Sequence, residues 1–313
     1  MNYEDRLRAL ALQDDRVVVL TAENRALVRS LPAVLGRRFI DTGITEQTLV
    51  GVAAGLALRG RIPIVHALAT FLTMRAFEFI RTDAGIPALP IKLSGFVPGF
   101  LSDGNGPTHQ ALEDVSLMRG IPHMEVYAPA DQDDLLQMLP VIWQSPNPAY
   151  IRINTRSTNY THDPVFVPGK AEVVARGTDV TILTYGMLFE QCLIAHDILK
   201  THGVSAGLIN MRSLKPVDAS AILEAAASSG FLVTVEDHFQ TGGLYSIAVE
   251  TLFRHGAMAR ILPLAFPERW YRPGRLDEVL AFEGFTGKQI AEKILGRASN
   301  AEQPAIAMNP FAE

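Results

Sequence analysis

The segment FIDTGITEQ, residues 39–47, indicates the fold most directly. Residues 38–41 form a short predicted strand, and Gly43 makes the turn into a helix expected over 46–59. A strand followed by a turn and a helix is the repeating unit of a parallel sheet, and ligands bind beyond the carboxyl ends of such strands. Glu46, at the start of this helix, therefore places a carboxylate where a ligand could bind. The alternative is that Glu46 only stabilises the first turn of the helix.

The same alternation of strands and helices extends over most of the chain. In a first unit we expect further helices at 3–13, 71–80 and 131–143 and strands at 16–20, 63–67, 89–93, 124–128 and 149–153. A second unit continues with strands at 180–184, 205–210 and 231–236 and helices at 188–202, 218–228 and 243–255. Such alternation favours mainly parallel sheets that are covered by helices on both faces.

At 313 residues the chain is long for a single core, so we expect an α/β protein of two domains. The predicted first domain, residues 1–160, is a doubly wound, mainly parallel sheet. A polar linker at 161–172 leads to a smaller α/β domain at 173–299, and a poorly ordered tail is expected at 300–313.

The composition excludes several classes of function. With a net charge of −5 and no block rich in Lys or Arg, the chain has no surface suited to nucleic acid. No apolar run is long enough to span a membrane, and the first residues show no signal-peptide pattern. The single cysteine, Cys192, excludes an internal disulfide and suggests a reducing compartment. We therefore expect a cytoplasmic protein that binds neither nucleic acid nor membranes.

A second stretch with functional character is GNGPTHQ, residues 104–110, at the end of a glycine-rich loop that begins at Gly95. The loop follows a predicted strand and is too long for a simple connection, which is typical of functional loops. His109 has a side chain suited to proton transfer near neutral pH. The alternative is a loop histidine that only satisfies backbone groups.

Other histidines have a weaker claim to a site. The run Glu236-Asp237-His238 precedes a glycine turn and looks like a site, but we interpret His238 as structural. We interpret His66 and His123 in the same way.

Several short motifs, weak singly, form a strong pattern together. They are GITEQ at 43–47, TFL at 70–72, RAFE at 75–78, GPTHQ at 106–110, MRGIP at 118–122, APAD at 128–131, MRSLKP at 211–216 and GGL at 242–244. In this order and spacing the chain resembles the C-terminal two-thirds of transketolases, from about Arg16 to about Lys293. It resembles most closely the small subunit of split transketolases. Related folds include deoxyxylulose-phosphate synthase and the β subunit of 2-oxo acid dehydrogenases.

The resemblance implies thiamine diphosphate as coenzyme and the first domain as its pyrimidine-binding domain. Glu46 matches the catalytic glutamate that hydrogen-bonds the aminopyrimidine and so activates the coenzyme. Phe71 matches the aromatic residue that stacks on this ring, and Phe77 would line the pocket, with core packing as the alternative for both. Met74 stands near a position that is often aromatic, and its thioether can still pack against a ring. Glu23 matches an acid near the cofactor, although a capping role is an alternative.

On the substrate side, His109 matches the histidine that points at the substrate carbonyl and hydroxyls. Asn105 stands where transketolases usually carry an aspartate that bonds a sugar hydroxyl, so hydrogen bonding is kept without the charge. Val97 stands where sugar-phosphate transketolases place another histidine. Because the flanking segment 96–100 is apolar, we expect a substrate that is less hydroxylated than a standard ketose phosphate.

Arg152 and Arg156 lie where relatives hold a phosphate-binding arginine, and the sequence leaves open which of them binds a phosphate or carboxylate. Relatives hold Mg²⁺ and the diphosphate through a Gly-Asp-Gly run with a downstream Asn, and this chain has no such run. The segment SDGN at 102–105 lacks the helix and Asn that should follow. We therefore expect no metal ligand here, and a separate α subunit that supplies the Mg²⁺-binding domain in an α2β2 assembly.

The leading interpretation is the β subunit of a split, transketolase-like transferase. It would cleave a ketose or 2-oxo donor and pass the carbanion unit to an aldehyde or ketone acceptor. One alternative is the β subunit of a 2-oxo acid dehydrogenase or of a pyruvate-decarboxylating synthase. Another is a non-catalytic scaffold subunit, against which the presence of Glu46, Phe71 and His109 together argues.

Overall fold

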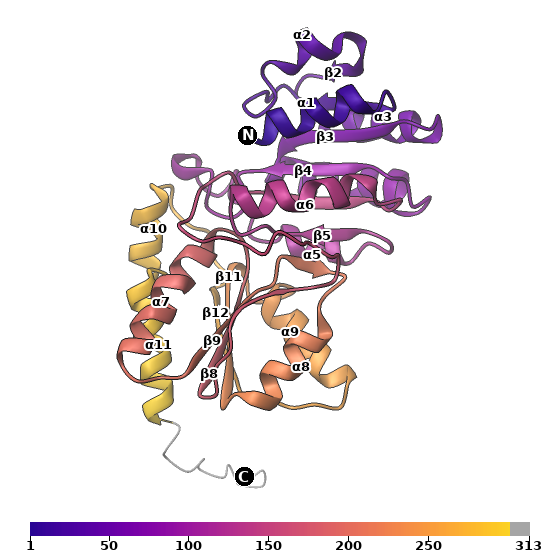
Figure 1. The fold of residues 1–313 in the computed structure, drawn as a ribbon. Coiled ribbons are helices and arrows are strands. Elements are labelled where there is room, and N and C mark those ends of the chain that lie inside the picture. The colour runs from indigo at the N-terminus through magenta and orange to yellow at the C-terminus, as the bar shows by residue number, and fades with distance from the viewer. Residues whose placement is uncertain (301–313) are drawn as a thin grey trace, which may run out of the picture.

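The computed structural model describes residues 1–300, the side chains of Asp103 and residues 298–300 excepted. The chain forms two α/β domains, and the first is built on a seven-stranded sheet of order β10-β5-β6-β4-β3-β1-β2 (Figure 1). Its strands are β1 (Val17–Thr21), β2 (Phe39–Asp41), β3 (Ile62–Leu68), β4 (Lys92–Phe96), β5 (Glu125–Tyr127), β6 (Ala149–Ile153) and β10 (Ser213–Lys215). All neighbours are parallel except β10, which pairs antiparallel with β5. The predicted mainly parallel sheet is confirmed.

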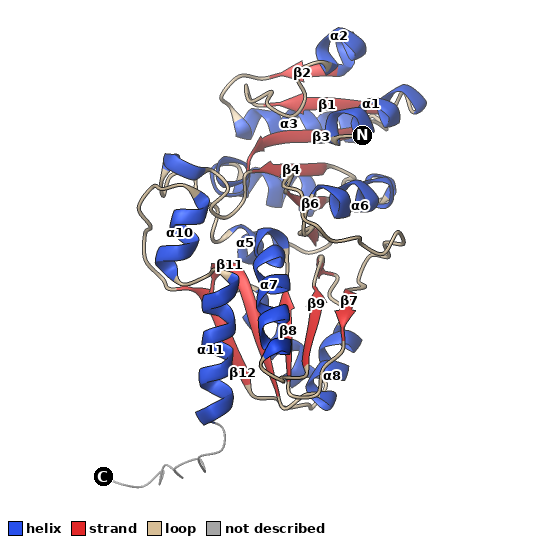
Figure 2. Ribbon diagram, turned by 60° about the vertical axis from the view of Figure 1, so that its left-hand side comes forward, coloured by secondary structure: helices blue, strands red, loops and turns tan. Residues whose placement is uncertain are grey.

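Helices cover both faces of this sheet because its central strands are apolar on both sides (Figure 2). In β1, Val17 and Val19 belong to one core cluster, whereas Val18 and Leu20 belong to another. Successive side chains of a strand point to opposite faces, so both faces need a cover. The first cluster includes α1 (Tyr3–Gln13), α2 (Leu31–Leu35) and α6 (Gln132–Gln144). The second includes α3 (Glu46–Leu58) and α5 (Asp114–Arg119).

The helix predicted over 71–80 forms as consecutive short pieces instead. A π-helical turn at Phe71–Arg75 is followed by α4 (Phe77–Phe79) and by a second π-helical turn at Ile80–Gly85. π-helical turns are rare and occur frequently at functional sites. Here the first of them begins just beyond the carboxyl end of β3, where a ligand site is expected.

The second domain has a five-stranded sheet of order β12-β11-β8-β9-β7. Its strands are β7 (Glu172–Ala175), β8 (Val180–Thr184), β9 (Ala206–Asn210), β11 (Phe231–Phe239) and β12 (Ile261–Phe266), and β7 is antiparallel to β9. α7 (Phe189–Thr201) and α11 (Gly287–Asn300) lie side by side on one face (Figures 1 and 2). α8 (Ala219–Ser228) and α9 (Leu244–Arg254) cover the other face, and α10 (Leu276–Glu283) precedes α11.

The sequence interpretation missed β7, β10, β12, α2, α5, α10 and α11. β10 is the most consequential, because this segment of the second half of the chain adds an edge strand to the first sheet and so ties the two domains together. The tail expected at 300–313 lies, apart from Asn300 at the end of α11, outside the described residues.

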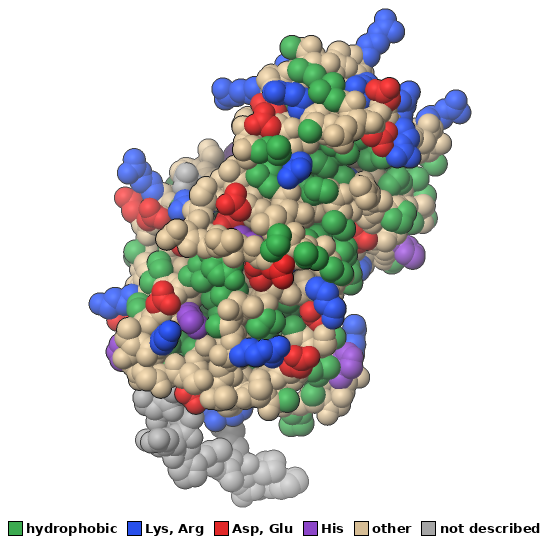
Figure 3. Space-filling view, viewed as in Figure 1, with side chains coloured by type: hydrophobic (Ala, Val, Ile, Leu, Met, Phe, Trp, Pro, Cys, Tyr) green, Lys and Arg blue, Asp and Glu red, His purple; other side chains and the backbone are tan. Residues whose placement is uncertain are grey.

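Within residues 1–300, the helices are too short or too polar to cross a membrane. On the face shown in Figure 3, Lys and Arg side chains are interspersed with Asp and Glu. The expected cytoplasmic location stays a prediction.

Candidate active site

The residues expected at the site follow the carboxyl ends of neighbouring strands. Glu23 follows β1, Glu46 follows β2, Phe71 follows β3, and the loop with His109 follows β4. Because these strands are parallel, their carboxyl ends meet at one edge of the sheet. The chain leaves β1 toward β2 on one side and returns to β3 on the other. Such a switch point in strand order creates a crevice in which ligands bind.

The turn before Glu46 is fixed by Asp41 at the end of β2. The Asp41 carboxylate accepts hydrogen bonds from the backbone N–H groups of Gly43 at 2.9 Å and Glu23 at 3.0 Å, and Arg25 Nε donates to it at 2.8 Å. Gly43 has φ +71°, a conformation that glycine adopts without strain. Glu46 then begins α3 and is only 2% exposed. This burial distinguishes Glu46 from an ordinary acid in a first helical turn, which is normally solvated.

Arg75 connects Glu46 to Phe71. Its Nη1 donates a hydrogen bond to Glu46 Oε2 at 2.8 Å, and its guanidinium carbon lies 4.3 Å from the centre of the Phe71 ring. The Phe71 ring meets the His109 imidazole edge to face, with 4.9 Å between ring centres. The structure thus brings Glu46, Phe71 and His109 into one continuous cluster. Arg75 had no role assigned from the sequence, although its place one turn after Phe71 in the RAFE motif is a signal that could have found it.

His109 lies on a loop whose two ends are joined. Gly99 and Ala111 exchange backbone hydrogen bonds of 3.0 and 3.2 Å, which closes residues 99–111 into a compact loop. The His109 backbone N–H donates to the Gly106 carbonyl at 2.9 Å, and its Nδ1 lies 2.9 Å from Thr108 Oγ1. The imidazole is half-buried and so combines a fixed position with access to a ligand.

The other residues expected to bind the cofactor lie close by in the chain. Met74 is half-buried within the first π-helical turn, and Phe77 is half-buried and packs against the core cluster that includes α3. Glu23 is exposed, with φ +66°. These assignments stay predictions, and core packing accounts for Phe77 equally well.

The substrate residues occupy different environments. Asn105 is exposed, and its side-chain amide donates to the Ser102 carbonyl at 2.9 Å. Arg156 is exposed and pairs loosely with Glu190 at 3.8 Å. Both side chains are therefore free enough to reach a ligand, and their roles stay predictions.

Val97 is half-buried with φ +45°, a strained conformation for a β-branched residue. Phe96, Pro98 and Phe100 are buried. The segment is apolar as its sequence states, but the side chains of these three neighbours pack into the interior and do not support the expectation of a less hydroxylated substrate. Only Val97 remains as an apolar residue of this segment that could face a substrate.

Arg152 lies in a position that argues against binding substrate. It is 1% exposed, its Nε donates to Asp114 at 2.9 Å, and its Nη1 donates to Asp237 of the second domain at 2.6 Å. Tyr150 donates a further hydrogen bond to Asp114 at 2.6 Å. A guanidinium engaged in this way is not available to a phosphate or carboxylate ligand. We therefore correct the sequence expectation and keep Arg156 as the candidate.

A second buried polar cluster also joins the two domains. Asp134, His162 and Glu172 lie close enough to share a metal ion, but Arg212 donates to Asp134 at 2.9 Å and His162 Nδ1 is 2.7 Å from Glu172. Burial lowers the pKa of His162, but hydrogen bonds to Asp131 and Glu172 outweigh it and raise this pKa to about 10. A protonated imidazole pairs with carboxylates and does not ligate a metal. The cluster is therefore an ion-pair network.

His66 and His238 differ from His162 because their pKa values are lowered. Each is fully buried, and burial lowers the pKa of each to about 4. His66 lies 2.8 Å from the Tyr3 hydroxyl and 3.1 Å from the Leu20 carbonyl. Neutral histidines held in this way serve the packing of the domains, in keeping with the structural role expected for them.

Comparisons with known proteins agree with this architecture. Residues 2–161 match the family model described as transketolase, pyrimidine binding domain, and residues 169–290 match the transketolase C-terminal domain. The chain belongs to the transketolase family.

Within that family, two of the relatives are named as subunits. A 6-deoxy-6-sulfo-D-fructose transketolase subunit of Clostridium sp. is 37% identical over 80% of this chain and 79% of its own length. One subunit of the apulose-4-phosphate transketolase of Phocaeicola vulgatus is 32% identical over 94% of this chain and 95% of its own. A solved split-gene transketolase, an inactive β4 tetramer, superposes with a TM-score of 0.85 at 31% identity, covering 95% of this chain and 97% of its own. The chain thus corresponds to the C-terminal subunit of a split transketolase.

Relatives named 1-deoxy-D-xylulose-5-phosphate synthase also match, and this chain spans about half of their length. The family implies dependence on thiamine diphosphate, and the cluster fits its aminopyrimidine. The flat guanidinium of Arg75 already makes both contacts that a flat nitrogen heterocycle needs, a hydrogen bond to Glu46 and a face against Phe71. The same acid and ring could receive the heterocycle in its place.

Proposed function

We propose that this chain supplies the pyrimidine half of a thiamine diphosphate site in a split transketolase. The observation that carries the proposal is the cluster in which Arg75 bridges Glu46 and Phe71, and Phe71 contacts His109. A buried acid, an aromatic face and a half-exposed imidazole within one crevice form a hydrogen-bonding, stacking and proton-transfer unit.

Glu46, Phe71 and His109 have separate roles in this site. Glu46 shares a proton with a ring nitrogen, and its burial keeps that hydrogen bond away from water. Phe71 orients the ring by stacking. His109 hydrogen-bonds the carbonyl or hydroxyl oxygen of the substrate and moves a proton there. The coenzyme, when bound, supplies the nucleophilic carbon and stores the transferred electron pair.

A partner α subunit would carry the Mg²⁺ and diphosphate domain in an α2β2 assembly. Two points support this. The chain lacks the Gly-Asp-Gly run, and two relatives that it covers over 79% and 95% of their length are named as subunits. Met74, Phe77 and Glu23 would complete the wall of the cofactor pocket from this side.

The substrates would be a ketose or 2-oxo donor and an aldehyde or ketone acceptor. Two relatives carry sugar names, one a sulfo-sugar and one a sugar phosphate, which favours a ketose with an anionic end. Arg156 is the exposed cation that could bind this end, Asn105 could bond a hydroxyl, and Val97 would limit the bulk or polarity that fits. A pyruvate-decarboxylating reaction is the second candidate, since 1-deoxy-D-xylulose-5-phosphate synthases also match.

Assays with and without the partner test this proposal. We expect the purified chain alone to be inactive and its complex with the α chain to transfer a ketol unit between sugars. Carbon dioxide release from pyruvate, with no ketose cleavage, would favour the second candidate. Full turnover by the chain alone would refute the split-site proposal.

A further inference from the structure

The loop that carries His109 is held at its base by the second domain. Asp237 lies near the end of β11, and its carboxylate is so close to Gly99 that a Cβ atom added at Gly99 would overlap it. Gly99 also has φ +59°, which favours glycine. The first residue of the closed loop therefore rests directly on an acid of the other domain.

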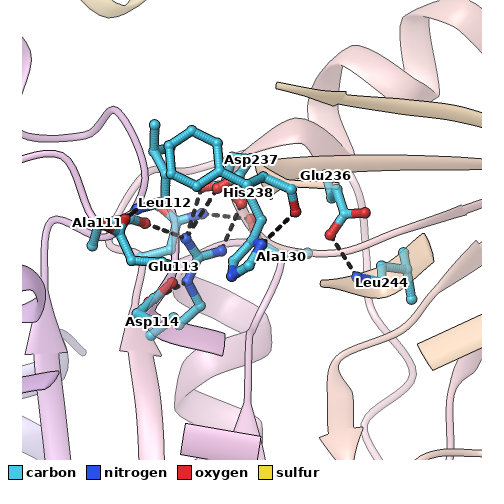
Figure 4. A network of polar contacts seen from close by, with 12 residues as sticks. Ala111, Leu112, Glu113, Asp114, Ala130, Glu236, Asp237, His238 and Leu244 are labelled. Carbon is cyan, nitrogen blue, oxygen red and sulfur yellow. Dashed lines mark hydrogen bonds and ion pairs between the residues drawn. The ribbon is translucent and has the colours of Figure 1, made fainter. Parts of the chain in front are cut away.

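Arg152 ties the same acid to the other end of the loop. Its Nη1 and Nη2 donate to the Asp237 carboxylate at 2.6 and 3.1 Å, and Nη2 also reaches the Ala111 carbonyl at 3.4 Å. Ala111 is the residue that closes the loop against Gly99. Figure 4 shows Asp237 and His238 meeting the segment from Ala111 to Asp114. The two ends of the loop thus share one buried carboxylate.

Apolar anchors extend the same attachment. Phe100, the second residue of the loop, and Leu112, just after it, both belong to the core cluster of the second domain. Phe100 contacts Phe266 and Tyr271, with ring centres 4.6 and 5.2 Å apart. Phe239, close to Asp237 in β11, donates its backbone N–H to the Leu112 carbonyl at 2.9 Å. The loop of residues 99–111 in the first domain is therefore anchored in the core of the second domain.

A buried ion network of this kind contributes little net stability compared with apolar packing, because desolvation opposes its Coulomb energy. Its clearest consequence is geometric, since the forked guanidinium and the carboxylate fix each other's orientation. Misplacement of a catalytic group by about 1 Å can lower a rate by about 10²-fold. The loop base is therefore a place where the second domain can affect chemistry without touching the substrate.

We propose that the second domain positions His109, with Asp237 as the positioning residue that holds Gly99 and, through Arg152, Ala111. The proposal rests on the substrate role proposed for His109. It assigns to the second domain a part in the active site although none of its residues needs to contact a ligand.

The test is Asp237→Asn, which keeps the shape of the side chain and removes its charge. We expect backbone amides of residues 99–111 to exchange hydrogen about 10-fold faster in the chain alone, since the base of the loop loosens. In the complex with the partner, kcat/KM should fall by about 10²-fold. In a His109→Ala background the same substitution should cause almost no further loss, because its effect acts through His109.

The matched control is Asp134→Asn, which breaks a buried ion pair between the same two domains, with Arg212, away from the loop. It should leave exchange in residues 99–111 and kcat/KM nearly unchanged. Gly99→Ala perturbs the same contact from the loop side, and it should reproduce the phenotype if Asp237→Asn does not fold. Unchanged exchange, or an Asp237→Asn loss that adds fully to that of His109→Ala, would overturn the inference. Full activity of His109→Ala would instead refute the proposed function and leave the exchange result standing.

Discussion

Arg75 donates a hydrogen bond to Glu46 at 2.8 Å, so a cation from the turn after β3 neutralises the acid that begins α3. The two partners differ sharply in exposure, because the Arg75 side chain is 39% exposed and that of Glu46 only 3%. The acid is fixed, whereas the arginine can withdraw toward solvent. This asymmetry is suited to a site in which a ligand replaces the arginine on Glu46.

Replacing Arg75 by Met should lower the free energy of unfolding by about 1 kcal/mol, because Glu46 stays buried and loses a charged partner. In a Glu46→Gln background the loss should shrink, since a neutral amide needs no counter-charge. Urea unfolding of the four proteins measures this coupling. Arg81→Met, at an exposed position of the following π-helical turn, is the control. An equal loss in both backgrounds would show that the ion pair contributes nothing.

Replacing Glu46 by Gln should lower kcat of the reconstituted enzyme by about 10²-fold or more, the usual contribution of a placed acid–base group. KM for the substrates should change little, because Glu46 acts on the coenzyme. The matched control is Glu78→Gln, an exposed acid in α4. Unchanged turnover in Glu46→Gln would favour the non-catalytic scaffold.

The fold could be predicted from the sequence where strands are apolar and helices begin at clear turns. β12 was not predicted because Pro263 interrupts its run of apolar residues, and proline is expected only in edge strands. β12 is indeed the edge of the second sheet. β10 is three residues long and pairs with a strand far away in the sequence, so no local pattern predicts it.

The site could be predicted only as separate residues. The motifs indicated Glu46, Phe71 and His109, but Glu46 is linked to Phe71 through Arg75, whose role depends on the π-helical turn. Arg152 was misread because the sequence alone left open whether Arg152 or Arg156 matches the phosphate-binding arginine of relatives. A signal was present, since a charged residue inside the buried run AYIRI must be paired with acids to be stable there.

Alkaline pH should loosen the interdomain cluster around His162. The pKa of His162 is raised to about 10 in the folded chain, above the ordinary value of 6.5, by its hydrogen bonds to Asp131 and Glu172, which outweigh burial. Its contribution to stability is therefore complete below pH 6.5 and is lost as the pH rises toward about 10. Urea midpoints at pH values across this window should fall for the native chain.

His162→Gln should be less stable near pH 6 and should lose most of this slope, whereas His202→Gln, at an exposed histidine, should keep it. A slope that persists unchanged in His162→Gln would assign the alkaline loss to another group.

At acid pH, stability depends on pH in the opposite direction. His66 and His238 have pKa values lowered to about 4 by burial, so the stability they contribute is lost as the pH falls from 6.5 toward 4.

Val97→Asn should raise stability and lower activity. Val97 has φ +45°, where a β-branched residue is strained and asparagine is tolerated, so relief of strain should stabilise the chain by about 1 kcal/mol. Val97→Ala removes the same side-chain packing but relieves less backbone strain, so it is the matched control. Because strain at a site is retained where it serves function, we expect kcat/KM to fall in Val97→Asn even as its unfolding midpoint rises. A Val97→Asn chain that is less stable than Val97→Ala would show that the side chain is held by packing, and the strain would then have no part in shaping the substrate loop.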